Sequence, residues 1–120
     1  LSQQVTTFAI TGEYMVCGLG DPETQKFSYE TIRISDGKVS AADSAVPLWR
    51  LAGSGSSCMY VDDTFAAHIL YPDTQQTDPL VINDFATYQN WPTIFCPDGV
   101  GGYLVEMDIE DTVTYWHITT

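Results

Sequence analysis

Three carboxylates stand at every second position near the end of the chain. Glu106, Asp108 and Glu110 belong to the run YLVEMDIED, whose alternation is typical of a β-strand. Along a strand these side chains share one face and lie about 6.8 Å apart. Calcium binds oxygen ligands at about 2.4 Å, so a cation site would need a second loop, such as Asp62-Asp63 or Asp98-Gly99. The sequence therefore predicts that this strand presents a solvated acidic face and that the protein has no cofactor. A Ca²⁺ site on the strand and a contact with a basic partner are the two alternatives.

Catalytic chemistry is not indicated by any residue spacing. Glycoside hydrolysis uses two carboxylates about 5–9 Å apart, and with 16 acidic residues such pairs arise by chance. The histidines, His68 and His117, belong to no zinc-binding, serine-nucleophile or Cys–His motif. The glycine-rich pieces lack the following helix of a phosphate loop. We therefore expect a protein that is not an enzyme, with a small hydrolase as the least favoured option.

Aromatic side chains give the stronger functional signal. The chain contains three tryptophans and seven tyrosines, and aromatic rings anchor protein interfaces and stack on sugars. Trp91 stands between Asn90 and Pro92, a loop context in which we expect it to be exposed. Segment 112–119 is apolar on both faces, which indicates that one of them meets a partner. The predicted binding or interface residues are Trp91, Tyr115, Trp116 and Ile118.

The elements that must position these residues are β-strands. Turn residues separate the alternating runs about every ten residues, a spacing typical of sandwiches and barrels. We expect one all-β domain over 1–120, an antiparallel β-sandwich or jelly-roll-like barrel of about 8–10 short strands. The clearest strand-like runs are 5–11, 13–18, 27–35, 46–52, 57–62, 65–71, 80–84, 92–96, 103–109 and 112–119.

Three turn signals refine this expectation. Asp36-Gly37 between alternating runs predicts a tight hairpin of the primed-turn type. The segment GSGSS, 53–57, is too short to separate domains and predicts a loop between strands. Thr77-Asp78-Pro79 has turn composition, and we expect the chain to turn there.

Charge limits the partners. Sixteen acidic residues against four basic ones give a net charge of −12, which repels phosphate backbones and anionic lipid. No apolar run approaches the roughly 20 residues of a membrane span. We therefore expect no nucleic acid and no membrane insertion, and an acidic surface that meets a second copy, a basic protein patch, a receptor or a glycan.

The cysteines indicate the compartment. Cys17, Cys58 and Cys96 each stand in an apolar stretch, where a buried thiol is usual. An odd count argues against a complete set of intramolecular disulfides, although one disulfide with a free thiol stays open. Sequons for N-glycosylation are absent, which also favours a reducing compartment. The first residues show neither the basic start nor the apolar stretch of a signal peptide. We expect the chain to be an excised piece of a longer one.

One segment carries a family resemblance. GGYLVEMDIED, 101–111, resembles a late β-strand of small icosahedral RNA-virus coat proteins, with Met107 where that motif usually has an aromatic residue. In size and charge the chain is similar to the protruding domain of nodavirus-like and tombusvirus-like capsids. The resemblance implies a β-sandwich spike that is made in the host cytoplasm, dimerises on the virion surface and takes part in host-cell attachment.

These observations together predict a non-enzymatic surface interaction domain, of which a dimeric capsid spike is the favoured form. The alternative is a secreted carbohydrate-binding module or lectin-like domain, in which Trp91 or Trp49 would stack on sugars. The upstream context separates the two, because a spike follows a basic arm and a shell domain.

Overall fold

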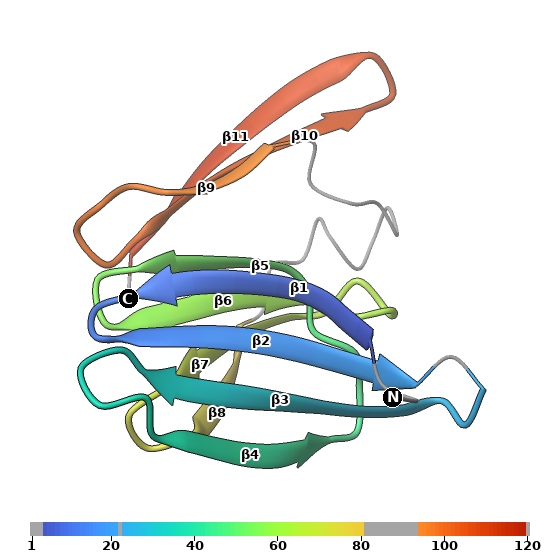
Figure 1. The fold of residues 1–120 in the computed structure, drawn as a ribbon. Coiled ribbons are helices and arrows are strands. Elements are labelled where there is room, and N and C mark those ends of the chain that lie inside the picture. Colours follow the sequence, from blue (N-terminus) through green and yellow to red (C-terminus); the bar gives the residue numbers. More distant parts are fainter. Residues whose placement is uncertain (1–3, 22, 81–93, 120) are drawn as a thin grey trace.

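The chain is built almost entirely from short β-strands (Figure 1). The computed structural model describes residues 4–21, 23–80 and 94–119. Within these ranges there is no helix, and hence none that could cross a membrane. The strands are β1 (Gln4–Thr11), β2 (Tyr14–Asp21), β3 (Lys26–Arg33), β4 (Val39–Ser44), β5 (Trp49–Ser54), β6 (Ser57–Val61), β7 (Ala67–Tyr71), β8 (Gln76–Leu80), β9 (Ile94–Pro97), β10 (Tyr103–Ile109) and β11 (Thr112–Ile118).

Three antiparallel sheets contain these strands. Their strand orders are β1-β2-β3-β4, β5-β6-β7-β8 and β11-β10-β9, so within each sheet the strands pair in the order in which they follow one another in the chain. Such meanders need only hairpin connections, which suits a chain with turn residues every ten positions. The all-β, sandwich-like prediction is confirmed, with eleven strands in the described ranges against the 8–10 expected.

The β5–β8 sheet is covered on both faces. Every residue of β6, SCMYV, is buried, as expected for a strand that is apolar on both sides. Met59 and Val61 pack in one core cluster with Tyr103, Val105 and Met107 of β10. The alternate side chains of the same sheet meet the β1–β4 sheet in a second cluster, which consists of Ala9, Val16, Tyr29, Leu48, Leu51, Cys58, Tyr60 and Leu70.

Two of the predicted turns differ from expectation. The β3–β4 hairpin forms, but its loop spans residues 34–38 and only Gly37 has a positive φ, of 71°. Both types of two-residue primed turn need a positive φ at the first loop residue, and Asp36 does not have one, so that prediction is wrong. The turn predicted over 77–79 is also wrong, because β8 contains these residues. Pro79 is tolerated since β8 is an edge strand. The loop predicted within 53–57 is confirmed as the tight β5–β6 hairpin, with Ser54 opposite Ser57.

The β10–β11 turn stores strain that can be relieved. Ile109 pairs with Thr112, so Glu110 and Asp111 form a two-residue loop with φ of 49° and 65°. Asn and Gly adopt this left-handed region more readily than Glu and Asp do. We therefore expect Glu110→Asn with Asp111→Gly to raise the free energy of unfolding by about 1 kcal/mol in urea denaturation. Glu110→Gln with Asp111→Ser removes the same charges, and an equal gain there would make the effect electrostatic.

Candidate functional site

The acidic strand does not assemble a metal site from the described residues. Glu106 and Asp108 lie on the outward face of β10, whereas Glu110 was expected beside them and instead lies in the turn beyond Ile109. Tyr115 stands opposite Glu106 on β11, and its hydrogen bond to Glu106 and the negative charge of that group raise its pKa. Over the described ranges, no three His, Cys, Asp or Glu side chains are grouped closely enough to hold a metal ion.

Both histidines are bonded to an aspartate that closes a loop. His68 Nε2 lies 2.7 Å from Asp62 Oδ2, and His117 Nε2 lies 2.7 Å from Asp98 Oδ2. In each loop the other carboxylate oxygen accepts the backbone N–H groups two and four residues further on. The hydrogen bonds from His117 and the backbone lower the pKa of Asp98 to about 2. Asp62 and Asp63 thus belong to the turn that follows β6.

This geometry stabilises loops and does not activate a nucleophile. Ser54 Oγ lies 3.3 Å from Asp98 Oδ1, on the side of the carboxylate away from the oxygen that His117 binds. A nucleophilic serine needs its hydroxyl on the imidazole rather than on the carboxylate. In the part of the chain that the structure describes, neither histidine has a hydrogen bond to a serine, threonine or cysteine.

The three cysteines are free thiols. Cys58 is fully buried, and burial raises its pKa to about 12. Cys17 and Cys96 are half-buried, and burial followed by the nearby charge of Glu30 raises the pKa of Cys17. Neither Cys17 nor Cys58 is therefore poised as a thiolate nucleophile by a lowered pKa. The option of one disulfide is not realised.

The predicted interface residues occupy different environments. Tyr115 is 70% exposed, and it lines a hollow of about 420 Å³ on the β9–β11 sheet with Leu104 and His117. Trp116 and Ile118 are half-buried and pack against the core cluster. Trp91 lies outside the described residues. The alternation predicted for segment 112–119 is confirmed, and a partner role for these four residues stays a prediction.

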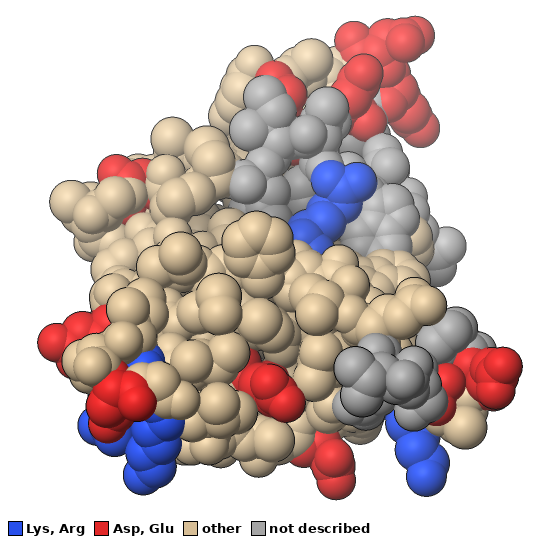
Figure 2. Space-filling view, in the orientation of Figure 1, with Lys and Arg blue, Asp and Glu red and all other residues tan. Residues whose placement is uncertain are grey.

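A larger apolar surface lies on the β1–β4 sheet. Its outward side chains form a continuous patch that is crossed by the carboxylates of Glu30 and Asp43, and Asp21 and Lys26 stand opposite each other on the same face where β2 ends and β3 begins. Figure 2 shows this front face largely free of charged groups, which gather at its rim. Four of its side chains are more than half exposed. The patch, called here the apolar outer face, comprises Val5, Phe8, Ile10, Met15, Cys17, Leu19, Ile32, Val39 and Ala41.

A bulge in β1 extends the apolar outer face. Val5 pairs with Leu19 and Phe8 pairs with Cys17, so the register shifts by one residue between them. In a regular strand, residues three apart point to opposite faces. The extra residue brings Val5 and Phe8 to the same side, at exposed fractions of 61% and 64%. A local backbone irregularity thus lengthens the apolar stripe along the sheet edge.

Sequence reasoning missed this surface, although a signal was present. The run MVC at 15–17 is apolar on both faces, and so is FAI at 8–10. Two-sided apolar strands are either covered twice or meet a partner. That inference was drawn for segment 112–119 and applies equally to β1 and β2.

Comparisons with known proteins give no identification. No protein-family model, no curated protein and no solved structure matches the chain. Function therefore has to be inferred from the surfaces themselves.

Proposed function

We propose that this protein is a non-enzymatic interaction domain that pairs with a second copy of itself through the apolar outer face. In its most specific form, the domain is the surface spike of a small icosahedral virus coat, dimeric on the virion and involved in host-cell attachment. The observation that carries the proposal is the exposure of Val5, Phe8 and Ile10 at 61–64% on one sheet face. Exposed apolar patches of this kind mark interaction sites.

Charge and shape favour a second copy as the occupant. Two chains of charge −12 repel each other least where carboxylates are scarce, and the outer face carries Glu30 and Asp43, with Asp21 opposite Lys26 at its end. A basic partner would instead be drawn to the acidic rim. Two identical sheets can pack face to face about 10 Å apart, as in a sandwich, and a two-fold axis makes such a contact self-complementary.

The size of the face suits a dimer contact. The sheet has four strands of up to eight residues each. With a rise of about 3.3 Å per residue and about 4.8 Å between strands, its flat area is roughly 500 Å². Side-chain relief raises the accessible area above the flat area, towards the ~800 Å² per partner of a standard interface.

The spike assignment rests on further support. The segment GGYLVEMDIED resembles coat-protein sequences, and the acidic, lysine-poor composition suits a module on the outside of a particle. If the domain is a spike, the coding sequence upstream of it encodes a basic arm and a shell β-domain. A catalytic domain in that position would contradict the spike and favour the carbohydrate-binding module.

Sedimentation velocity over a range of concentrations tests the dimer. Phe8→Asp places a carboxylate at the most exposed apolar side chain of the outer face, and we expect it to raise the dimer dissociation constant at least about 100-fold, the effect of losing a hot-spot residue. Tyr115→Asp adds the same charge on the β9–β11 sheet and is expected to change the constant less than about threefold. Raised salt should tighten the wild-type dimer by screening its charge.

Two outcomes would overturn the assignment. A wild-type domain that stays monomeric at millimolar concentration has no self-association to explain. If Tyr115→Asp separates the dimer and Phe8→Asp does not, the interface lies on β11, as the sequence alone predicted. Circular dichroism of each variant confirms that the substitution at an exposed site leaves the strands formed.

A further inference from the structure

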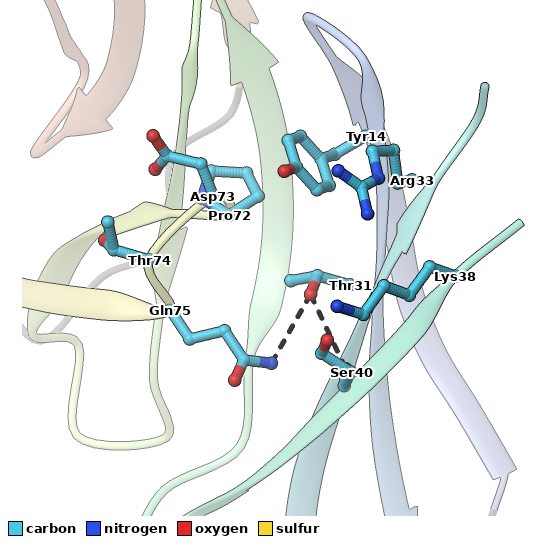
Figure 3. A pocket seen from close by; sticks show the side chains of 9 residues that line it. All are labelled: Tyr14, Thr31, Arg33, Lys38, Ser40, Pro72, Asp73, Thr74 and Gln75. Atoms are coloured by element: carbon cyan, nitrogen blue, oxygen red, sulfur yellow. Dashed lines mark hydrogen bonds between the residues drawn. The ribbon is translucent and has the colours of Figure 1, made fainter. Parts of the chain in front are cut away.

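A polar cavity of about 190 Å³ lies at one end of the core, between the β1–β4 sheet and the β7–β8 turn (Figure 3). Its sheet wall consists of inward-facing positions, where a β-sandwich normally places apolar residues. Further along the same inner face, Val16 and Tyr29 are buried in the core. At the cavity, hydroxyl and cationic side chains replace them. The lining residues are Tyr14, Thr31, Arg33, Lys38, Ser40, Pro72, Asp73, Thr74 and Gln75.

Positive charge is concentrated at this cavity. Arg33 and Lys38 are two of the four basic residues in the whole chain, and both line it. The Nε–H of Arg33 is paired with Asp36 at 3.1 Å, while its remaining donors are carried by the two terminal nitrogens. Within the described ranges, no carboxylate lies in ion-pair distance of the Lys38 ammonium group.

The acidic groups nearby offset only part of this charge. Asp73 lines the opposite wall, and Figure 3 shows its carboxylate directed away from Arg33 and Lys38. Asp36 accepts the backbone N–H of Lys38 as well as the Arg33 pair, so its charge is held at the hairpin loop. These hydrogen bonds, the backbone one first, lower the pKa of Asp36. A chain of charge −12 therefore keeps one local site with two cations facing a cavity.

The two walls are tied together across the cavity. The hydroxyl of Tyr29 donates to the carbonyl of Gln75 at 3.0 Å, and Gln75 Nε2 donates to Thr31 Oγ1 at 3.4 Å. Thr31 Oγ1 in turn lies 3.5 Å from the carbonyl of Ser40. These bonds link the β7–β8 turn to β3 and β4, so the cavity is formed without a ligand. A preformed site binds without the cost of ordering its walls.

We propose that this cavity binds a small oxyanion, a carboxylate or a phosphate carried by at most about six carbon atoms. Arg33 and Lys38 would bind the oxyanion, and the hydroxyls of Tyr14, Ser40 and Thr74 would take hydrogen bonds from the rest of the ligand. The volume is about that of six waters, well below a drug-sized pocket, which excludes a dinucleotide or an oligosaccharide. The site does not depend on the proposed dimer, because it opens from the inner face of the sheet.

Calorimetric titration of the purified chain at low salt tests the site with three probes: glucuronate, inorganic phosphate and glucose. Glucuronate and glucose differ only in the carboxylate, so we expect saturable binding of an anion and none of glucose. Binding of glucuronate alone identifies a sugar acid as the source of the oxyanion, and binding of phosphate alone identifies a phosphate. Failure of both anions to bind, or equal binding of glucose, would overturn the proposal.

Charge variants locate the binding. Lys38→Gln is expected to weaken anion binding about tenfold, because it removes one charged hydrogen-bond donor. Lys26→Gln changes the net charge equally and does not line the cavity, so it should alter affinity less than twofold. Asp73→Asn should strengthen binding by removing the opposing charge. Equal losses in the two lysine variants would show that the net charge of the chain, and not the cavity, governs the binding.

Discussion

Replacing Gly53 with alanine is expected to lower the free energy of unfolding by at least about 3 kcal/mol. Gly53 lies on β5 where β1 crosses it, and an added Cβ would stand 2.5 Å from the carbonyl oxygen of Ile10 and 2.8 Å from Cβ of Thr11. These atoms cannot move aside cheaply, because Thr11 Oγ1 is bonded to the carbonyls of Gly55 and Ser57 at 2.7 and 2.9 Å. Urea unfolding followed by tryptophan fluorescence measures the loss.

Gly37→Ala is the matched control for this prediction. Nothing lies within 4 Å of an added Cβ at Gly37, but its φ of 71° disfavours alanine. Gly37→Ala should therefore lower the free energy of unfolding only through the unfavourable backbone conformation of alanine, by about 1 kcal/mol. If Gly53→Ala lowers the free energy of unfolding no more than Gly37→Ala does, the close approach of β1 and β5 does not require a glycine at position 53. A loss of about 3 kcal/mol or more would show that the packing of the two sheets depends on the absence of a side chain at Gly53.

Most strands could be predicted because a half-buried strand leaves a period of two in the sequence. The run YLVEMDI places Tyr103, Val105 and Met107 inward as expected, and all three are almost fully buried. The buried strand β6 was recognisable from the apolar run SCMYV. In these segments the sequence alone was sufficient to assign the buried face, because successive side chains of a strand point to opposite faces of the sheet.

Edge strands could not be predicted in the same way. The segment QTDPL has the composition of a turn, yet it forms β8. Its pairing is decided by β7, whose residues Ala67 to Tyr71 supply the partners on one side. A strand with only one neighbour needs only half of its backbone groups for the ladder, so Pro79 costs little there. Tertiary pairing therefore overrides local propensity at the sheet edge.

The candidate surfaces were predictable only in part. Alternation assigns side chains to two faces, but it does not state which face another sheet covers. The inner face of β2 is buried through Val16, while Met15 and Cys17 stay on the outer face. The cavity was equally hidden, because Thr31 and Gln75 are 44 residues apart in the chain. Sheet order brings such groups together, and the sequence does not display sheet order.

The same limit applies to the two aspartate loops. An aspartate that bonds backbone groups two residues ahead is a local turn device, and Asp62 and Asp98 could be expected to act so. Their histidines arrive by strand pairing: His68 lies on the next strand, whereas His117 is 19 residues from Asp98. The sequence therefore predicts the loops but not the His–Asp pairs that support them.

The Asp62 loop gives the second large prediction. The side chain of Asp62 is 4% exposed, and its Oδ1 accepts from the amide and hydroxyl of Thr64 at 2.8 and 2.6 Å and from the amide of Ala66 at 3.1 Å. Asp62→Ala leaves these donors and His68 without their acceptor. We expect a loss of about 3 kcal/mol, because unpaired donors near the interior are costly. Asp63→Ala, at the exposed neighbouring carboxylate, should cost less than about 0.5 kcal/mol.

The pH dependence separates this role from mere packing. Burial alone would raise the pKa of Asp62, but the hydrogen bonds from Thr64, His68 and Ala66 outweigh it and hold the pKa below its ordinary value of 3.8. The carboxylate therefore stabilises the folded state above about pH 4, and this contribution is lost as the pH falls through the lowered pKa. The stability difference between wild type and Asp62→Ala should be present in full at pH 5 and shrink below pH 4. A difference that stays unchanged down to pH 2.5 would mean that the lost side-chain volume, and not the charged acceptor, causes the destabilisation.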